Sequence, residues 1–360
     1  MGNELLTRAE CNALRGIAII GIVLHNYCHW LRGIVRENEY QFFESNVEGL
    51  NGVLAHPDAL LPIHLLSFFG HYGVPLFLFL SAYGLVRKYE GPTLHPVSQV
   101  APLPFIWHHY QKLFKMMFAG FVAFVVIDTI MPRGHHYRAL DIVAQLGMFN
   151  NVLPSPDQII WPGPYWFFGL MLQLYVVYRL LLYRRHWGWT VALMAVCTLA
   201  QLLFGPESEE LNRYRYNFMG GMLPFGLGLL YGRLPKTLPQ NYNWLFCLIS
   251  LILIYTEGQT FFGWMLVPLF VCSAGFTLVK LLPGWLLRGL EWMGGISAAL
   301  FVCHPITRRV FIGLSYRGDL LEGLMLYVIA SIALALLFKR IQEGSPKVLQ
   351  HNKEIQEPKP

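Results

Sequence analysis

The chain has 360 residues, of which 55% are hydrophobic, 15% aromatic and only 13% charged. Soluble domains carry about 25% charged residues, so this balance excludes an ordinary soluble protein. The apolar segments are continuous rather than alternating, which excludes a transmembrane β-barrel and indicates an all-α, polytopic helical bundle in a lipid bilayer. The formal net charge of +6 follows from the placement of basic residues between these segments and gives no sign of nucleic-acid binding.

The apolar segments predict about ten transmembrane helices, since a span needs about 20 predominantly apolar residues. Their approximate ranges are 13–30, 67–86, 113–131, 165–183, 187–204, 218–233, 243–257, 261–282, 294–313 and 319–338. Residues 60–69 are expected to form an interfacial helix. We expect residues 1–340 to form a single membrane domain and residues 341–360 to form a polar, disordered cytoplasmic tail. No small-residue cleavage site follows the first apolar segment, so we expect an uncleaved helix there.

The distribution of lysine and arginine predicts the orientation of the bundle. With a cytoplasmic N-terminus, about two thirds of the 27 basic residues fall in inner segments, as the positive-inside rule requires. An even number of spans then places both termini in the cytoplasm, and we expect a multi-pass protein of the inner (cytoplasmic) membrane. The outer loops 31–66, 132–164 and 205–217 are long or polar, and such loops often bind ligands. The first carries Glu37 and Glu39 among its acidic residues.

The motifs of soluble and metal-dependent enzymes are absent from the sequence. None of the six cysteines forms a C-x-x-C pair, so neither a disulfide framework nor a cysteine zinc site is expected. There is also no H-E-x-x-H, no Walker loop and no G-x-S-x-G. We therefore expect no bound metal.

The first predicted helix carries ionisable side chains, which a membrane span holds only at a cost in free energy. Arg15 lies near its start, and His25 and His29 lie near its end. A rise of about 1.5 Å per residue puts Arg15 and His25 roughly 15 Å apart along the axis. Arg15 can then reach one membrane face while His25 lies deep, facing a hydrated cavity. A hydrogen-bonded structural histidine is the alternative explanation.

The segment LRGIAIIGIVLH resembles the opening of the acyltransferase-3 family, the integral-membrane, acyl-CoA-dependent acyltransferases of bacterial surface glycans. In that family ten residues separate a basic residue from a histidine, whereas nine separate Arg15 from His25, and Asn26 occupies the family's histidine position. In a regular helix His25 lies some 80° from the face of Arg15, and His29 returns to within about 40° of it. A π-bulge would restore His25 to that face. We favour His25 as the catalytic histidine and keep His29 as the alternative.

Two further features resemble family motifs near the cytoplasmic side. Ser81, in GVPLFLFLSAYGLVRKYE, matches a serine in the family's second helix, although Ala82 replaces the usual glycine. Ordinary packing of small residues between helices is the alternative explanation for Ser81. Lys112 and Lys115 resemble the family's Arg-x-x-Arg and share one helix face, where they could hold coenzyme A phosphates. Positive-inside anchoring is the alternative for these lysines.

Two more features lie in the fourth and ninth spans. Tyr165 and Trp166 open the fourth span in WPGPYWFFG, which resembles a tryptophan-containing family segment and could contact sugar rings. An interfacial aromatic belt would explain the same residues. His304 and Arg308 flank Pro305, for which we expect a kink. His304 could line the cavity of His25 or satisfy carbonyls that the proline leaves free.

The resemblance implies an acyl-CoA donor on the cytoplasmic side, with acetyl-CoA expected as a co-substrate rather than a permanently bound cofactor. It also implies a hydroxyl of a cell-surface or exported glycan as the acceptor. His25 would act as the general base, Arg15 would stabilise donor phosphate or developing charge, and Lys112 and Lys115 would hold the coenzyme. The alternative function is a transporter or flippase that moves a glycan or lipid-linked sugar without acyl chemistry.

Overall fold

The computed structural model describes residues 5–91, 101–235 and 239–343, which form helices and no strand. This confirms the all-α prediction. The α-helices are α1 (Arg8–Cys28), α2 (Glu44–Ala55), α3 (Leu61–Phe69), α4 (Gly73–Tyr89), α5 (Pro102–Ile130), α6 (Ala139–Leu146), α7 (Pro156–Ile159), α8 (Trp166–Val177), α9 (Trp187–Leu199), α10 (Glu209–Arg215), α11 (Phe218–Gly232), α12 (Asn243–Glu257), α13 (Phe261–Trp264), α14 (Val267–Leu278), α15 (Gly284–Gly295), α16 (Ser297–Ser315) and α17 (Leu320–Glu343). Short 3₁₀ or π elements are η1 (Gly70–Tyr72), η3 (Asn150–Val152), η4 (Gly163–Tyr165), η5 (Tyr178–Leu182), η6 (Ala200–Leu203) and η7 (Gln240–Tyr242).

Each of the ten predicted spans coincides with helical structure, but the helices differ in length. Five elements are long and apolar enough to cross a membrane, namely Arg8–Cys28, Leu61–Tyr89, Pro102–Ile130, Gly163–Leu182 and Leu320–Ile341. The helices α15 and α16, bent by 67° at their junction, form a sixth candidate. The other apolar helices are shorter, namely Trp187–Leu203, Phe218–Gly232, Asn243–Glu257 and Val267–Leu278. The described residues therefore form a multi-pass helical membrane bundle.

The predicted interfacial segment and the predicted C-terminal tail both differ in extent from the helices observed. The interfacial segment 60–69 is helical as α3, but it continues through η1 into α4 as one long element. Of the predicted tail, residues 341–343 complete α17, and the remainder lies outside the described residues.

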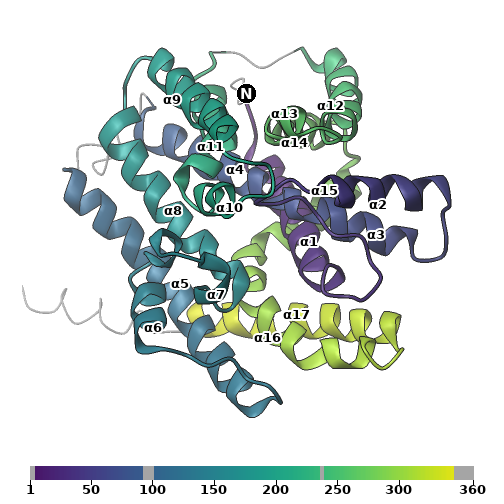
Figure 1. The fold of residues 1–360 in the computed structure, drawn as a ribbon. Helices are drawn as coiled ribbons and strands as arrows, with labels where there is room; N and C mark the ends of the chain where they lie inside the picture. The colour runs from purple at the N-terminus through teal and green to yellow at the C-terminus, as the bar shows by residue number, and fades with distance from the viewer. Residues whose placement is uncertain (1–4, 92–100, 236–238, 344–360) are drawn as a thin grey trace, which may run out of the picture.

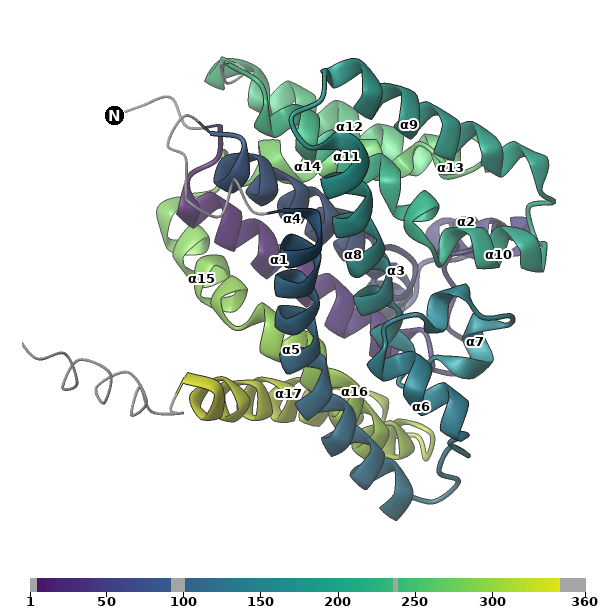
Figure 2. The same ribbon diagram turned by 90° about the vertical axis from the view of Figure 1, so that its left-hand side faces the viewer.

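The first helix lies at the centre of the bundle. Figures 1 and 2 show α1 surrounded by α4, α15 and α16, and it packs against all three and against the α3–η1 segment. The hairpin of α16 and α17 lies at one end of the molecule, while α9, α11, α12 and α14 gather at the other (Figure 2). Side chains on α1 can therefore meet residues from both halves of the chain.

The start and course of α1 follow from its sequence. Thr7 and Glu10 form a capping box, in which the Thr7 hydroxyl accepts from the Glu10 amide at 3.2 Å and the Glu10 carboxylate accepts from the Thr7 amide at 2.7 Å. The helix is then regular to Cys28. The π-bulge that would align His25 with Arg15 is absent from α1, and the described π-helical turn is η5 instead.

Close contact between α1 and α15 depends on two glycines. A Cβ atom at Gly16 would overlap the Leu290 carbonyl oxygen, and one at Gly294 would overlap the Asn12 carbonyl oxygen. The two backbones meet directly at this crossing, as membrane helices do where small residues line the interface. This contact fixes α1 against the second half of the chain.

We expect Gly294→Ala to destabilise the bundle, because the added methyl group meets rigid backbone and not a flexible side chain. Overpacking of this kind costs typically about 1–3 kcal/mol. Gly295→Ala is the matched control, since nothing lies within 4 Å of its Cβ position. The apparent melting temperature in detergent should fall for Gly294→Ala alone. Equal melting temperatures for the two variants would contradict the close crossing.

The fold also predicts which loops lie on opposite membrane faces. Glu48 is an exposed residue of α2, near the end of α1 that carries His29, whereas Arg185 is exposed beyond the far end of α8 and η5. We expect an impermeant thiol reagent to label only one of Glu48→Cys and Arg185→Cys in intact cells, and both after membrane disruption. The parent protein, with its six native cysteines, gives the background. Labelling of both variants in intact cells would contradict this topology.

Candidate active site

A pocket of about 280 Å³ lies beside the C-terminal end of α1. Its walls come from widely separated parts of the chain: α1 and the loop that follows it, η1 and the start of α4, the segment that leads into α8, Tyr216 after α10, and α16. The polar and aromatic side chains that line it include Asn26, His25, His29, Glu37, Glu39, Tyr40, His71, Asp157, Trp161, Trp166 and Arg308. The site is therefore assembled by the tertiary fold around the first helix.

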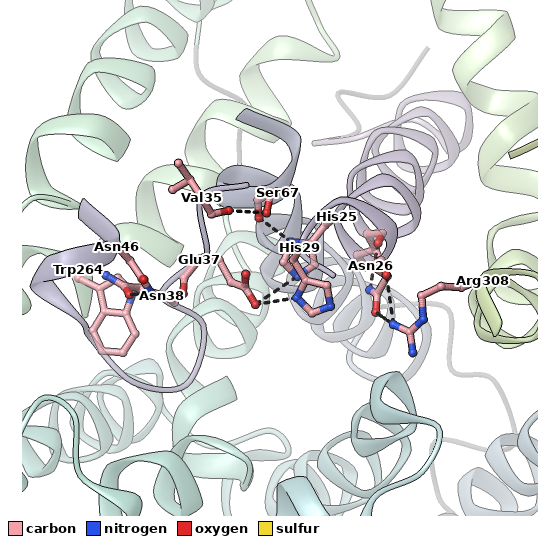
Figure 3. A network of polar contacts seen from close by, with 11 residues as sticks. His25, Asn26, His29, Val35, Glu37, Asn38, Asn46, Ser67, Trp264 and Arg308 are labelled. Atoms are coloured by element: carbon pink, nitrogen blue, oxygen red, sulfur yellow. Dashed lines mark hydrogen bonds and ion pairs between the residues drawn. The ribbon is translucent and has the colours of Figure 1, made fainter. Parts of the chain in front are cut away.

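His25 is held in a defined orientation within this pocket. Its side chain is 3% exposed, and its Nδ1 lies 2.7 Å from the Ser67 carbonyl oxygen (Figure 3). A carbonyl oxygen can only accept, so Nδ1 carries the proton and Nε2 keeps a lone pair. Ser67 is itself fixed, because its hydroxyl donates to the Val35 carbonyl oxygen at 2.6 Å. The free nitrogen of His25 is therefore the one that can accept a proton.

Glu37 lies between the two histidines of α1. Its Oε1 is 3.7 Å from His25 Nε2 and 3.0 Å from His29 Nδ1, as Figure 3 shows. The two imidazole centroids are 4.6 Å apart. His29 follows the last residue of α1, and its amide donates to the His25 carbonyl oxygen at 3.0 Å. Both predicted catalytic histidines thus share one carboxylate.

Several polar atoms of the pocket have no protein partner. These buried atoms are His29 Nε2, Glu37 Oε2, His71 Nδ1 and Trp161 Nε1. Buried polar groups are almost always hydrogen-bonded to protein or water. A pocket that gathers donors and acceptors in this way suits a polar ligand with several hydroxyl groups.

The carboxyl groups of the pocket differ in their ionisation. Burial opposes ionisation of Glu37, but the adjacent His25 and His29 outweigh it and lower the pKa of the Glu37 carboxyl below its usual range. Burial, together with the nearby Glu37 carboxylate, raises the pKa of Glu39 to about 8. At neutral pH Glu37 is therefore charged, while Glu39 is mostly protonated and can donate a hydrogen bond.

An aromatic wall lies next to these carboxyl groups. Tyr40 stacks on Tyr216 with centroids 4.0 Å apart and meets Trp166 edge-on at 5.3 Å. The Tyr216 hydroxyl donates to Asp157, which also accepts from Asn212 at 2.6 Å. Trp166 also lines the pocket. Tyr165 does not line it: its buried hydroxyl donates to the Val302 carbonyl oxygen at 2.9 Å.

The structure brings Arg308 into the pocket and leaves His304 behind it. Arg308 Nη1 donates to the Asn26 carbonyl oxygen at 3.1 Å, and its guanidinium lies 5.2 Å from the centroid of Trp30. His304 is fully buried, with Nδ1 3.1 Å from the Leu300 carbonyl oxygen, and is not a lining residue. Helix α16 continues through Pro305, and the sharp bend precedes it at the junction with α15.

The remaining predicted site residues lie toward the other end of α1. Arg15 donates a hydrogen bond to the Asn12 side-chain oxygen at 2.9 Å. Arg15 and Lys88 both lie close enough to Lys112 to interact with its charge. Lys112 and Lys115 are both exposed on α5. The Ser81 side chain is hydrogen-bonded to the Tyr175 hydroxyl. Arg15 lies close enough to Tyr175 to interact with it electrostatically. Arg15 and Lys112 thus lie near each other and outside the lining of the histidine pocket.

Glu37, Glu39, His71 and Asp157 belong to no motif in the sequence. The two glutamates stand out there only as polar residues of a long loop. No periodic or spacing signal marks them, because their positions depend on how loops fold over α1. The H-x-x-x-H spacing of His25 and His29 was the one local sign that both histidines share a face.

Comparison with known proteins gives one match. The sequence model of the acyltransferase-3 family, described as an acyltransferase domain, matches residues 8–340. No curated protein and no solved structure matches the chain. Because the match covers nearly the whole length, the chain belongs to the acyltransferase-3 family and is a membrane acyltransferase.

Proposed function

We propose that this protein transfers an acyl group, expected to be acetyl, from acyl-CoA to a hydroxyl of a cell-surface or exported glycan. The proposal rests on the hydrogen bonding and orientation of the His25 ring, in a chain that belongs to this family. His25 Nδ1 is hydrogen-bonded to the Ser67 carbonyl oxygen, and His25 Nε2 lies 3.7 Å from the Glu37 carboxylate that lines the same pocket. This arrangement suits a general base.

In the proposed reaction, His25 Nε2 accepts the proton of the sugar hydroxyl as the oxygen attacks the thioester carbonyl. The tetrahedral intermediate then expels the coenzyme A thiolate, which takes the proton back from His25. Glu37 stabilises the imidazolium that exists between these steps, since opposite charges at this distance attract strongly in a buried site. The Trp161 indole N–H and the Arg308 guanidinium are the pocket's donors for the developing oxyanion.

The acceptor would bind on the aromatic and carboxyl side of the same pocket. Trp166 and Tyr40 offer faces and edges to a sugar ring, while Glu39 and Asp157 offer partners to its hydroxyl groups. Ser81, Tyr165 and His304 were also expected to bind substrate, but they lie outside the pocket lining. Their proposed role is to support the walls.

The donor would approach from the opposite end of α1. We propose that Arg15, Lys112 and Lys115 hold the phosphates of coenzyme A at the cytoplasmic face of the inner membrane, with both termini on that face. Roughly 15 Å of helix separates Arg15 from His25, so the pantetheine arm must bridge the two groups. On this orientation Glu48→Cys is the variant that the external reagent labels.

We expect His25→Ala to reduce the rate of acyl transfer by about 10²–10⁴, the usual contribution of a general base. His29→Ala should cost much less, because His29 contacts Glu37 and leaves the base intact. The measurement is acyl transfer from radiolabelled acetyl-CoA by purified protein in detergent. His56→Ala, at an exposed position after α2, is the histidine control.

A larger loss in His29→Ala than in His25→Ala would move the base to His29. Small and equal losses in both variants would remove the histidine mechanism. Absence of acyl-CoA turnover by the parent protein, with glycan movement across vesicles, would favour the transporter instead.

Donor binding gives a second prediction for this site. Lys112→Gln with Lys115→Gln should raise the KM for acyl-CoA by about tenfold, since two exposed charge contacts contribute up to about 1 kcal/mol each. The value of kcat should change little. The control is Arg184→Gln with Arg185→Gln, which removes the same charge from the loop after η5. An unchanged KM in the lysine variant would show that these lysines only anchor the helix.

A further inference from the structure

His25, His29 and Glu37 present three metal-ligand atoms to one point. Each of the three residues offers one ligand atom, and these atoms all lie within 4.8 Å of one another. Glu37 Oε1 faces His25 Nε2 on one side and His29 Nδ1 on the other. Ligands of a tetrahedral zinc ion at about 2.0–2.1 Å lie roughly 3.3 Å apart. The separations of 3.0 Å and 3.7 Å from Glu37 Oε1 lie on either side of that value. Small side-chain movements would therefore bring all three to bonding distance.

The ligand types and their positions favour a metal of the zinc class. Two histidines at i and i+4 on one helix face, with one carboxylate, match the donor set that zinc enzymes use with an open fourth position. Imidazole ligands select zinc, copper or nickel over magnesium and calcium. The fourth position here would face the pocket that the three residues line.

The surroundings already provide what such a site needs. The Ser67 carbonyl oxygen fixes the His25 ring through Nδ1 and leaves Nε2 available, as second-shell partners of metal-binding histidines do. His29 Nε2 is buried without a partner, so the His29 proton can move there and free Nδ1. Within the described residues, the basic side chains that contact the Glu37 carboxylate are histidines alone, and His25 is neutral in the tautomer that Ser67 fixes. A divalent cation would balance this largely buried carboxylate.

We propose that His25, His29 and Glu37 bind a divalent zinc-class cation, and that its binding blocks acyl transfer. The inhibitory part rests on the proposed function, because the metal would occupy the lone pair of His25 Nε2 that accepts the substrate proton. Metal binding itself does not depend on that function. The site would thus link acyl transfer to the availability of free zinc.

The first experiment measures binding without reference to activity. Full-length protein, purified without a polyhistidine tag and stripped with chelator, is dialysed against Zn²⁺, and bound zinc is measured by mass spectrometry. We expect one tightly bound zinc per chain, and a tetrahedral absorption spectrum when Co²⁺ replaces it. His29→Ala and Glu37→Gln should each weaken binding at least tenfold, whereas His56→Ala should bind as the parent does. Gel filtration checks that each variant remains monodisperse.

The second experiment measures acyl transfer by stripped protein as Zn²⁺ is added. We expect inhibition in the parent protein, and a shift of the inhibitory concentration to at least tenfold higher values in His29→Ala. Absence of stoichiometric binding, or binding that survives both His29→Ala and Glu37→Gln, overturns the metal site. Binding accompanied by activation overturns the inhibitory role and the base assignment together. Zinc binding in a protein without acyltransferase activity would leave the site standing and refute the proposed function alone.

Discussion

The hydrogen bond of 2.7 Å between His25 Nδ1 and the Ser67 carbonyl oxygen is the interaction on which the pocket depends. It fixes the tautomer and direction of the buried imidazole and joins α1 to α3. The Ser67 hydroxyl extends the connection to Val35, in the loop that carries Glu37. Since His25 and His29 both face that loop, the carboxylate meets two nitrogens whose positions are already set. The geometry of the site thus follows from one helix and the segment folded against it.

The ionisable side chains of this pocket are paired differently from those elsewhere in the bundle. Ionisable groups are costly inside a membrane protein, so most are paired with an opposite charge. Asp128 of α5 accepts from Arg309 of α16 at 2.6 Å, and Glu90 pairs with Arg233 at 2.8 Å. Those pairs connect distant segments and leave no reactive atom free. In the pocket, by contrast, Glu37 is shared by histidines only, and buried donors and acceptors lack partners. Buried polar atoms without partners reduce the stability of the folded protein unless a ligand forms hydrogen bonds with them.

How far the sequence predicts this molecule depends on how local each feature is. Apolar runs predict helices because burial in lipid acts on each segment alone, and all ten segments are helical. The pairing of His25 with His29 follows from helical periodicity. By contrast, the position of Glu37 depends on a loop that folds back over α1, and no local pattern encodes it. The missing π-bulge has a similar origin: family spacing suggested it, but α1 keeps regular hydrogen bonding to its end. The segments that carry Tyr165 and His304 do contribute residues to the pocket. The side chains of Tyr165 and His304 themselves point elsewhere and bond to backbone carbonyl oxygens of α16.

The proposed base and the proposed metal site require the same property of His25, an accessible lone pair beside a negative charge. For proton transfer, Glu37 must stabilise a positive imidazolium without forming a tight contact that removes the lone pair, and 3.7 Å meets both conditions. A divalent cation placed between the same atoms gains from both ligands at once. Substituting Glu37 would therefore weaken both processes. His29 differs, because it contributes a third ligand to the metal but only an indirect contact to the base. That asymmetry makes His29 the position at which acyl transfer and metal inhibition can be separated.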